Sequence, residues 1–457
     1  MNVDPMNLCP FQRRTLALVL ILMTLLLQPA VPARADRIDD LVRSAMETQR
    51  IPGLSLAVVV RGKVVRLGGY GFANLEHQIP AAQDTVYQIG SITKPFTALG
   101  ILLLQEEGRL RLEDSVGQYV AEAPEDWRRV TLRQLLQHSA GVPSEIDPQG
   151  FPAPLPEDFT PLRMLSMIRQ PSLEFEPDTR RSYSNMGYFL LGLVIEKVSG
   201  MGYAAYLEER VFRRLGMAAT RVNSLDALVP RRASGYKFPG EYQNWAPVDP
   251  RIPYAAGAIV SSVEDLARWD LAMDAHQLIP CERWEESWTA SQAPSDSLPN
   301  TGLGWMLDVD RGRQRIFHPG GIPGFSSVMV RYPDERVTVI VLCNQMTGLG
   351  GLATAIADSW LPQPKGTRPH VVTLSSASEA KSVQIAGSFN GWFPEPMKRR
   401  GGVWTARVQL PPERQFYKFV VDGQWILDPA NPLAESDGRG NTNSVLERKV
   451  VISTAGR

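Results

Sequence analysis

The sequence predicts an α+β fold followed by a small, separate β-sandwich. Residues 54–60 and 64–67 form two apolar strand patterns, and the turn Arg61-Gly62-Lys63 joins them as a hairpin. An apolar helical pattern lies at residues 96–104. A long antiparallel hairpin packed against a helix is typical of the α+β class. Near the C-terminus the pattern changes to short alternating strands separated by turn residues, which predicts the sandwich.

Length and composition indicate several domains in a chain of ordinary globular character. At 457 residues the chain is long for one domain. We expect residues 1–35 to be a leader, 36–360 the main domain, 361–370 a Pro-rich linker and 371–450 the sandwich. Basic and acidic residues both number 48, so the sequence does not predict a nucleic-acid partner.

The N-terminus has the form of a secretory signal peptide. Arg13 and Arg14 precede an apolar run at residues 15–27, and Ala33-Arg34-Ala35 has the small-x-small form of a cleavage site. The run is too short to span a bilayer comfortably, and an uncleaved anchor is the alternative interpretation. We therefore expect a periplasmic or secreted protein with no stable membrane anchor after cleavage.

The cysteines and histidines do not predict a metal site. Export permits a disulfide between Cys281 and Cys343. Cys343 ends the apolar run at residues 337–342, which favours a buried free thiol, and the pairing stays open. The five histidines form no cluster with metal-ligand spacing, so we expect no metal and no cofactor.

Ser91 and Lys94 are the first candidate catalytic pair. They stand three residues apart at the start of the apolar helix, so the amine can reach the hydroxyl on one helix face. Burial lowers the pKa of a lysine, and a neutral amine can accept the proton of a serine nucleophile. Most such pairs are solvated surface residues, so the interpretation depends on further motifs downstream.

The second motif is Tyr183-Ser184-Asn185, directly before an apolar helix at residues 188–198. A tyrosine hydroxyl near a lysine can be held ionised or be poised as a proton acceptor. The Asn185 amide can donate to a substrate carbonyl while its oxygen fixes the lysine. The alternative is that both residues belong to an ordinary turn before the helix.

The third motif is His318-Pro319-Gly320-Gly321, with strand patterns on both sides of it. The two glycines would let a substrate approach the backbone, and the amide N–H of Gly321 with that of Ser91 would form an oxyanion hole. A polar residue at a strand end is the alternative for His318.

Another histidine, His138, lies near the C-terminus of a helix predicted at residues 130–141, with Thr131 as the N-cap. We expect His138 to be a capping or core residue.

In order and spacing, these three motifs resemble the serine β-lactamase and penicillin-binding-protein-like family, most closely its class C β-lactamase-related branch of esterases and D-aminopeptidases. The likeness covers residues 36–360. It implies an antiparallel sheet flanked by helices, with a helical subdomain between the first and third motifs. It also implies that Ser91 is acylated, that Lys94 and Tyr183 share proton transfer, and that Asn185 positions the substrate.

One departure from the family pattern bears on the substrate. The third motif usually reads lysine, then threonine or serine, then glycine, whereas here it reads His318-Pro319-Gly320. The cation is lost at neutral pH unless the histidine pKa is raised, and the proline removes a hydroxyl. β-Lactams and D-Ala-D-Ala termini carry a carboxylate that this cation would bind, so we expect neutral esters or amides instead.

Three stretches of the C-terminal segment, at residues 386–392, 417–425 and 428–443, share a pattern with a known sugar-binding module. They resemble the glycogen-binding module of the AMP-activated kinase β subunit, an immunoglobulin-like β-sandwich. It implies that Trp392 and Trp425 stack on glucose rings, and that Lys418 and Asn443 bond the sugar hydroxyls. We expect Trp404 to be a core residue. Core packing of both tryptophans, in a module used only for docking, is the alternative.

Together the motifs predict an exported serine hydrolase that acts through an acyl-enzyme on an ester or amide and carries an α-glucan-binding module. Within that class, a β-lactamase, D,D-peptidase or D-aminopeptidase is the alternative. A second alternative is a non-catalytic glucan-binding or acyl-sensing protein.

Overall fold

The computed structural model describes residues 32–144, 155, 159–166, 172–295, 298–363, 366–436 and 441–446. The predicted signal peptide lies largely outside these residues. The first helix of the described chain is α2 (Pro32–Gln49). In the part of the chain that is described, no single helix is long and apolar enough to cross a membrane. One bent pair of helices, Asn185–Ser199 and Tyr203–Phe212, meets the length and composition criteria when the two are taken together.

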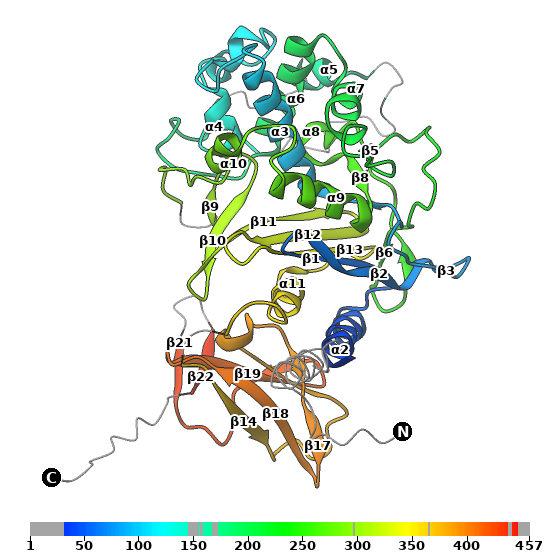
Figure 1. Cartoon of the computed structure of the whole chain (residues 1–457), viewed down its shortest axis with the longest axis vertical. Helices are drawn as coiled ribbons and strands as arrows, with labels where there is room; N and C mark the ends of the chain where they lie inside the picture. Colours follow the sequence, from blue (N-terminus) through cyan, green and yellow to red (C-terminus); the bar gives the residue numbers. More distant parts are fainter. Residues whose placement is uncertain are drawn as a thin grey trace, which may run out of the picture. The chain divides into compact units, whose positions relative to one another are not determined.

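The main domain is built on one antiparallel sheet of eight strands, which confirms the predicted class (Figure 1). In spatial order the strands are β3 (Ile79–Pro80), β2 (Lys63–Asn74), β1 (Gly53–Val60), β13 (Val337–Cys343), β12 (Phe325–Tyr332), β11 (Arg313–Ile322), β10 (Met306–Asp310) and β9 (Asn300–Thr301).

The central strands are hydrophobic on both faces because helices cover both. Every residue of β12 and β13 is buried. Helix α9 (Val263–Asp274) contacts β1 and β13 on one face, and α11 (Gly350–Ala357) contacts β12 and β13 on the other (Figure 1). Continuous apolar strands are expected where a sheet has no solvated face.

The remaining helices form the subdomain between the first and third motifs. They are α3 (Thr93–Glu106), α4 (Leu132–Leu136), α5 (Pro161–Ser166), α6 (Asn185–Ser199), α7 (Tyr203–Leu207), α8 (Tyr254–Gly257) and α10 (Cys281–Ser287). Helices α3 and α6 are its core and pack on each other, because most of their residues are apolar and buried.

Two sequence-based boundaries were wrong. The second strand of the hairpin, predicted to end at residue 67, is β2, and it continues through the glycine-rich stretch at residues 68–71 to Asn74. A Cβ at Gly69 would lie 2.2 Å from the Ala81 carbonyl oxygen, so glycine here serves close packing within the strand. Helix α4 begins at its predicted N-cap, Thr131, which forms a capping box with Gln134. The helix stops at Leu136, however, and His138 takes φ +60° just beyond it.

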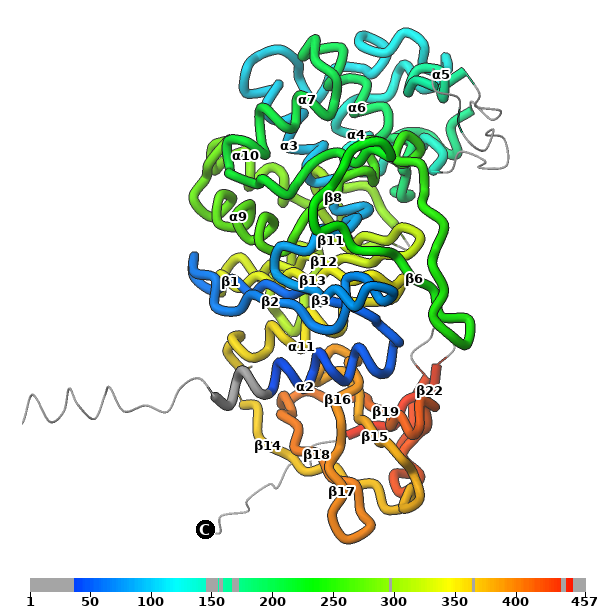
Figure 2. The backbone as a smooth tube through the Cα atoms, turned by 90° about the vertical axis from the view of Figure 1, so that its right-hand side faces the viewer, coloured from blue at the N-terminus to red at the C-terminus, as the bar shows by residue number. Residues whose placement is uncertain are grey.

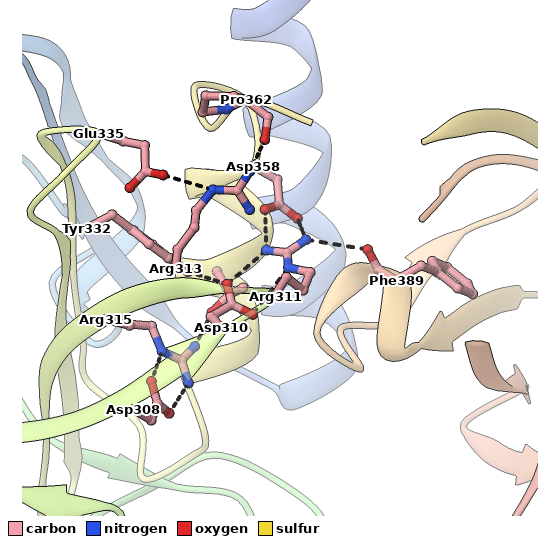
Figure 3. Close-up of polar contacts among 11 residues, drawn as sticks. Asp308, Asp310, Arg311, Arg313, Arg315, Tyr332, Glu335, Asp358, Pro362 and Phe389 are labelled. Atoms are coloured by element: carbon pink, nitrogen blue, oxygen red, sulfur yellow. Dashed lines mark hydrogen bonds and ion pairs between the residues drawn. The ribbon is translucent and has the colours of Figure 1, made fainter. Parts of the chain in front are cut away.

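A network of ion pairs anchors the β10–β11 hairpin, whose second strand carries the third motif (Figure 3). Arg311, at the turn, bonds Asp310 and Asp358, and Asp358 caps the C-terminus of α11. Arg315 pairs with Asp308 across the two strands. These largely buried pairs hold β11 in place against α11.

The C-terminal module is a two-sheet structure whose strands run from β14 to β22 (Figure 2). One sheet has the order β14 (Arg368–Leu374), β18 (Val403–Leu410), β17 (Lys398–Arg400). The other has the order β16 (Glu395–Pro396), β15 (Val383–Gly387), β19 (Gln415–Val421), β22 (Thr442–Leu446), β21 (Ala434–Ser436), with β20 (Gln424–Ile426) beside β19. The predicted linker overlaps β14, which begins at Arg368; Pro369 is tolerated because β14 is an edge strand.

Candidate active site

Ser91 and Lys94 lie together at the N-terminus of α3. Ser91 is in the short 3₁₀ turn Gly90–Ile92, and Lys94 is the second residue of the helix. The Nζ of Lys94 is 3.2 Å from the Oγ of Ser91. Gly90 takes φ +49°, and a Cβ there would lie 2.9 Å from the amide nitrogen of Gly321. The two backbones that carry the predicted oxyanion donors are therefore in close contact.

Lys94 is completely buried, and its surroundings favour the neutral amine. Loss of hydration lowers its pKa well below the usual lysine range. Its Nζ lies 2.8 Å from Oδ1 of Asn185 and 2.9 Å from the carbonyl oxygen of Ala256. A neutral amine has two N–H groups and one lone pair. The two oxygens accept both N–H groups, so the lone pair is left for the hydroxyl of Ser91.

Tyr183 lies beside this pair as a protonated phenol. Burial raises its pKa above the ordinary tyrosine value, although a hydrogen bond with Ser91 opposes the shift. From the sequence, Tyr183 could be either an ionised phenolate or a neutral phenol. The raised pKa favours the neutral phenol at neutral pH. The ring of Tyr183 also faces Lys94, with Nζ 4.6 Å from its centroid.

His138 supports the second motif from behind, in agreement with the core role expected for it. Its side chain is buried, its ring centroid is 4.6 Å from that of Tyr183, and its Nδ1 accepts the backbone N–H of Ser184 at 3.1 Å. The Ser184 hydroxyl caps α6 by accepting the N–H of Gly187. This places Asn185 as the first residue of the helix, directed at Lys94.

His318, the third-motif residue, is buried in β11 and uncharged. Burial and the nearby Lys94 lower its pKa to about 3. Its Nδ1 lies 2.7 Å from the carbonyl oxygen of Pro319. The site therefore lacks the cation that a lysine would supply at this position.

The two glycines of the third motif have different reasons to be glycine. A Cβ at Gly320 would lie 2.1 Å from the carbonyl oxygen of Ile89, so no side chain fits there. At Gly321 the nearest atom to such a Cβ would be Cε of Met346, at 3.8 Å. Gly320 thus serves the contact between β11 and the Ser91 turn, and only Gly321 leaves room for a Cβ.

Two lobes of a cleft meet at Ser91, Tyr183 and Gly321. The first lobe has a volume of about 540 Å³; its further lining residues are Gly90, Ser144, Asn185, Met186, Phe189, Val248, Ile252, Pro253, Ala256, Gly257, Ile322 and Pro323. The second has about 520 Å³; its further lining residues are Leu298, Met306, His318, Pro319, Gly320, Ser326, Met346 and Thr347. Among the described residues, no charged side chain lines either lobe.

Sequence reasoning missed the apolar wall of the first lobe and the carbonyl of Ala256. Met186 and Phe189 lie three positions apart, on one face of α6, and this spacing was the available signal. The same spacing also describes a core helix, so the pattern cannot separate a pocket wall from a core face.

The four predicted sugar contacts gather in one cavity of the C-terminal module, of about 830 Å³. It is lined by Trp392, Phe416, Lys418, Trp425, Ser436, Asn441 and Asn443. Trp425 is 48% exposed, whereas Trp404 is buried and donates its indole N–H to the Ala377 carbonyl, as expected for a core residue. Phe416, Ser436 and Asn441 were not predicted.

The structure answers the question that the sequence left open about the two cysteines. Cys281 and Cys343 are both free, and Cys343 is buried. Within the described residues, histidine, cysteine and carboxylate side chains form no group of three that could hold a metal ion.

Comparisons with known proteins agree with this arrangement. A family model described as Beta-lactamase matches residues 38–358, and a model described as the glycogen recognition site of AMP-activated protein kinase matches residues 370–451. Penicillin-binding protein 4* of Bacillus subtilis (strain 168) is 31% identical over 304 residues, which are 62% of this chain and 66% of that protein. The chain thus spans just under two thirds of this relative's length.

Solved structures give the same picture. An octameric penicillin-binding protein homologue from Pyrococcus abyssi has a TM-score of 0.64 at 24% identity, covering 86% of this chain and 95% of that chain, and shows the shared fold. A D-stereospecific amidohydrolase from Streptomyces sp. has a TM-score of 0.59 at 29% identity, covering 69% of this chain and 95% of that chain.

Proposed function

Since the chain belongs to the beta-lactamase family of serine hydrolases and carries a glycogen-recognition module, we propose that it hydrolyses neutral esters or amides through an acyl-enzyme on Ser91. The observation that carries this proposal is the environment of Lys94. Its amine is buried, held by two oxygens, and 3.2 Å from the Ser91 hydroxyl.

Acylation begins when Ser91 attacks the substrate carbonyl and Lys94 accepts its proton. The ammonium that forms keeps its bonds to Asn185 and Ala256, and two tyrosine rings, Tyr183 at 4.6 Å and Tyr188 at 5.6 Å, stabilise the new charge. The backbone N–H groups of Ser91 and Gly321 bind the oxyanion.

The leaving group departs with a proton from the Tyr183 phenol, which Lys94 restores. Tyr183 suits this step because it is protonated at neutral pH and hydrogen-bonded to Ser91. Water then attacks the acyl-enzyme by the reverse route. Tyr183 accepts a proton from the water while its own phenolic proton passes to the neutral Lys94, and the Lys94 ammonium then returns a proton to Ser91 as the acyl group leaves.

The neutral cleft favours neutral substrates. A carboxylate entering the His318 lobe would meet no cation and would lose about 1.5–3 kcal/mol of charge-assisted hydrogen bonding. This argues against β-lactams and D-Ala-D-Ala termini, and for esters and simple amides.

The cavity of the C-terminal module supports α-glucan binding, because two tryptophans and three amide or ammonium side chains line it. The bound glucan would serve as a substrate or as an anchor. The N-terminal pattern supports a periplasmic or secreted location.

The test is activity on a short-chain nitrophenyl ester, on nitrocefin and on a D-amino-acid amide, with wild type and Ser91→Ala. We expect rapid turnover of the ester, little or none of nitrocefin, and complete loss in the variant with glucan binding intact. Turnover of nitrocefin above that of the ester would favour the β-lactamase alternative. A stoichiometric burst without a steady state would favour an acyl sensor.

A further inference from the structure

The imidazole of His318 is held in one tautomer that presents a hydrogen-bond acceptor. Its Nδ1 lies 2.7 Å from the Pro319 carbonyl, and a carbonyl oxygen only accepts, so Nδ1 carries the proton. Nε2 is left with a lone pair. Among the described residues Nε2 has no protein partner, and the residue lines the second lobe of the cleft.

A second acceptor lies in the same lobe. The Thr347 hydroxyl donates to Oε1 of Gln49, so its oxygen presents only lone pairs to the cleft. Ser326 is a third oxygen there, and its Oγ already accepts the backbone N–H of Thr347 at 2.8 Å. Lysine and arginine are absent from the described lining of this lobe. The lobe therefore offers two acceptors, Nε2 of His318 and Oγ of Thr347, with no lysine or arginine beside them in its described lining.

The two lobes meet at Ser91, so a substrate must place its acyl group in one and its leaving group in the other. Ser144 and Asn185 line the first lobe, but Met186 and Phe189 give it the apolar wall that suits an acyl chain. This leaves the second lobe, with His318, Ser326 and Thr347, for the leaving group. In hydrolysis the attacking water takes the place of the leaving group, so the same position must hold polar molecules.

We infer that the His318 lobe selects a leaving group that carries a hydroxyl or N–H donor next to the scissile bond and no anion. This inference deepens the proposed function and rests on it. The donor bonds Nε2 of His318, a group that would repel a carboxylate. A glucan acylated at O2 or O3 satisfies this requirement, because the other of these two carbons carries a free hydroxyl next to the ester.

The test compares three butyrate esters that differ only in the leaving group: 2-hydroxyethyl, 2-methoxyethyl and carboxymethyl. Butyrate release in a pH-stat gives kcat/KM for each. We expect the hydroxyethyl ester to exceed the methoxyethyl ester on the order of threefold to tenfold, the worth of one neutral hydrogen bond. The carboxymethyl ester should be the poorest of the three.

Two variants assign the preference to His318. His318→Leu should bring the hydroxyethyl and methoxyethyl esters to equal kcat/KM, and His318→Lys should raise the carboxymethyl ester relative to both. Val248→Ala, in the first lobe, should change all three esters alike. Equal rates on the hydroxyethyl and methoxyethyl esters in an active wild type would overturn the inference and leave the proposed function standing. If no ester is hydrolysed and a fluorophosphonate does not label Ser91, both the inference and the proposed function are wrong.

Discussion

Asn185 and Lys94, 91 positions apart in the chain, meet at 2.8 Å through Oδ1 and Nζ. The contact exists because Ser184 caps α6 and Ser91 precedes α3, so that both helices begin at the same point. An amide oxygen here accepts from the lysine without adding charge. The lysine therefore stays neutral, as a base for Ser91 requires.

Asn185→Asp should shift the pH dependence of catalysis upward. A carboxylate this close favours the ammonium form and raises the pKa of Lys94 by about 1–3 units. Since the free amine is the active form, the acidic limb of the kcat/KM profile should move to higher pH. Asn185→Leu removes the acceptor without adding charge, and should lower kcat without that upward shift. If the acidic limb of the kcat/KM profile of Asn185→Asp stays at the wild-type pH, a group other than Lys94 determines that limb.

Lys94 should also leave a signature in stability. Its pKa is depressed in the folded protein, so the unfolded chain binds one more proton between the folded value and about 10.4. Folding then releases that proton and is favoured by rising pH. Compared with Lys94→Met, wild type should gain about 1.4 kcal/mol in unfolding free energy per pH unit between the lowered pKa of the folded Lys94 and about pH 10. The gain should end above about pH 10.4, where the unfolded lysine is also neutral.

Denaturant unfolding at several pH values measures this difference. Ser91→Ala retains the lysine and should follow the wild-type dependence. A difference between wild type and Lys94→Met that stays flat with pH would show that the lysine is charged in the folded protein, against the base role proposed for it.

The sequence predicted most of the site because its residues stand at helix starts, where local spacing determines position. Ser91 and Lys94 needed only helical spacing, and the family resemblance, confirmed by the comparisons, supplied the order of the motifs. The apolar wall of Met186, Phe189 and Val248 was not predictable, because a pocket wall and a core have the same composition. The length of β2 was missed because its glycines serve close packing and also resemble a loop.

Gly320 and Gly321 make a matched pair for testing which glycine the fold requires. Gly320→Ala places a Cβ 2.1 Å from the Ile89 carbonyl oxygen, so β11 must shift, and the melting temperature should fall by several degrees or more. Gly321→Ala meets only the flexible Met346 at 3.8 Å and should keep the wild-type melting temperature. Equal losses in both variants would show that the two positions are constrained alike.

Trp425→Ala should weaken retention on a glycogen or amylose matrix. The indole is 48% exposed beside Trp392 and Lys418, so it is available to stack on a glucose ring, and its loss should reduce affinity on the order of tenfold. Affinity electrophoresis in glycogen-containing gels measures the effect.

Val371→Ala is the matched control for this variant. Val371 is 54% exposed on β14, in the sheet of the module that does not contain Lys418 or Trp425, so retention should stay at the wild-type level. Hydrolysis of a small soluble ester should be the same in both variants, because every described residue that lines the Ser91 cleft lies before position 348. If Trp425→Ala binds glycogen as well as Val371→Ala does, stacking on this indole contributes nothing, and the module does not bind glucan through this cavity.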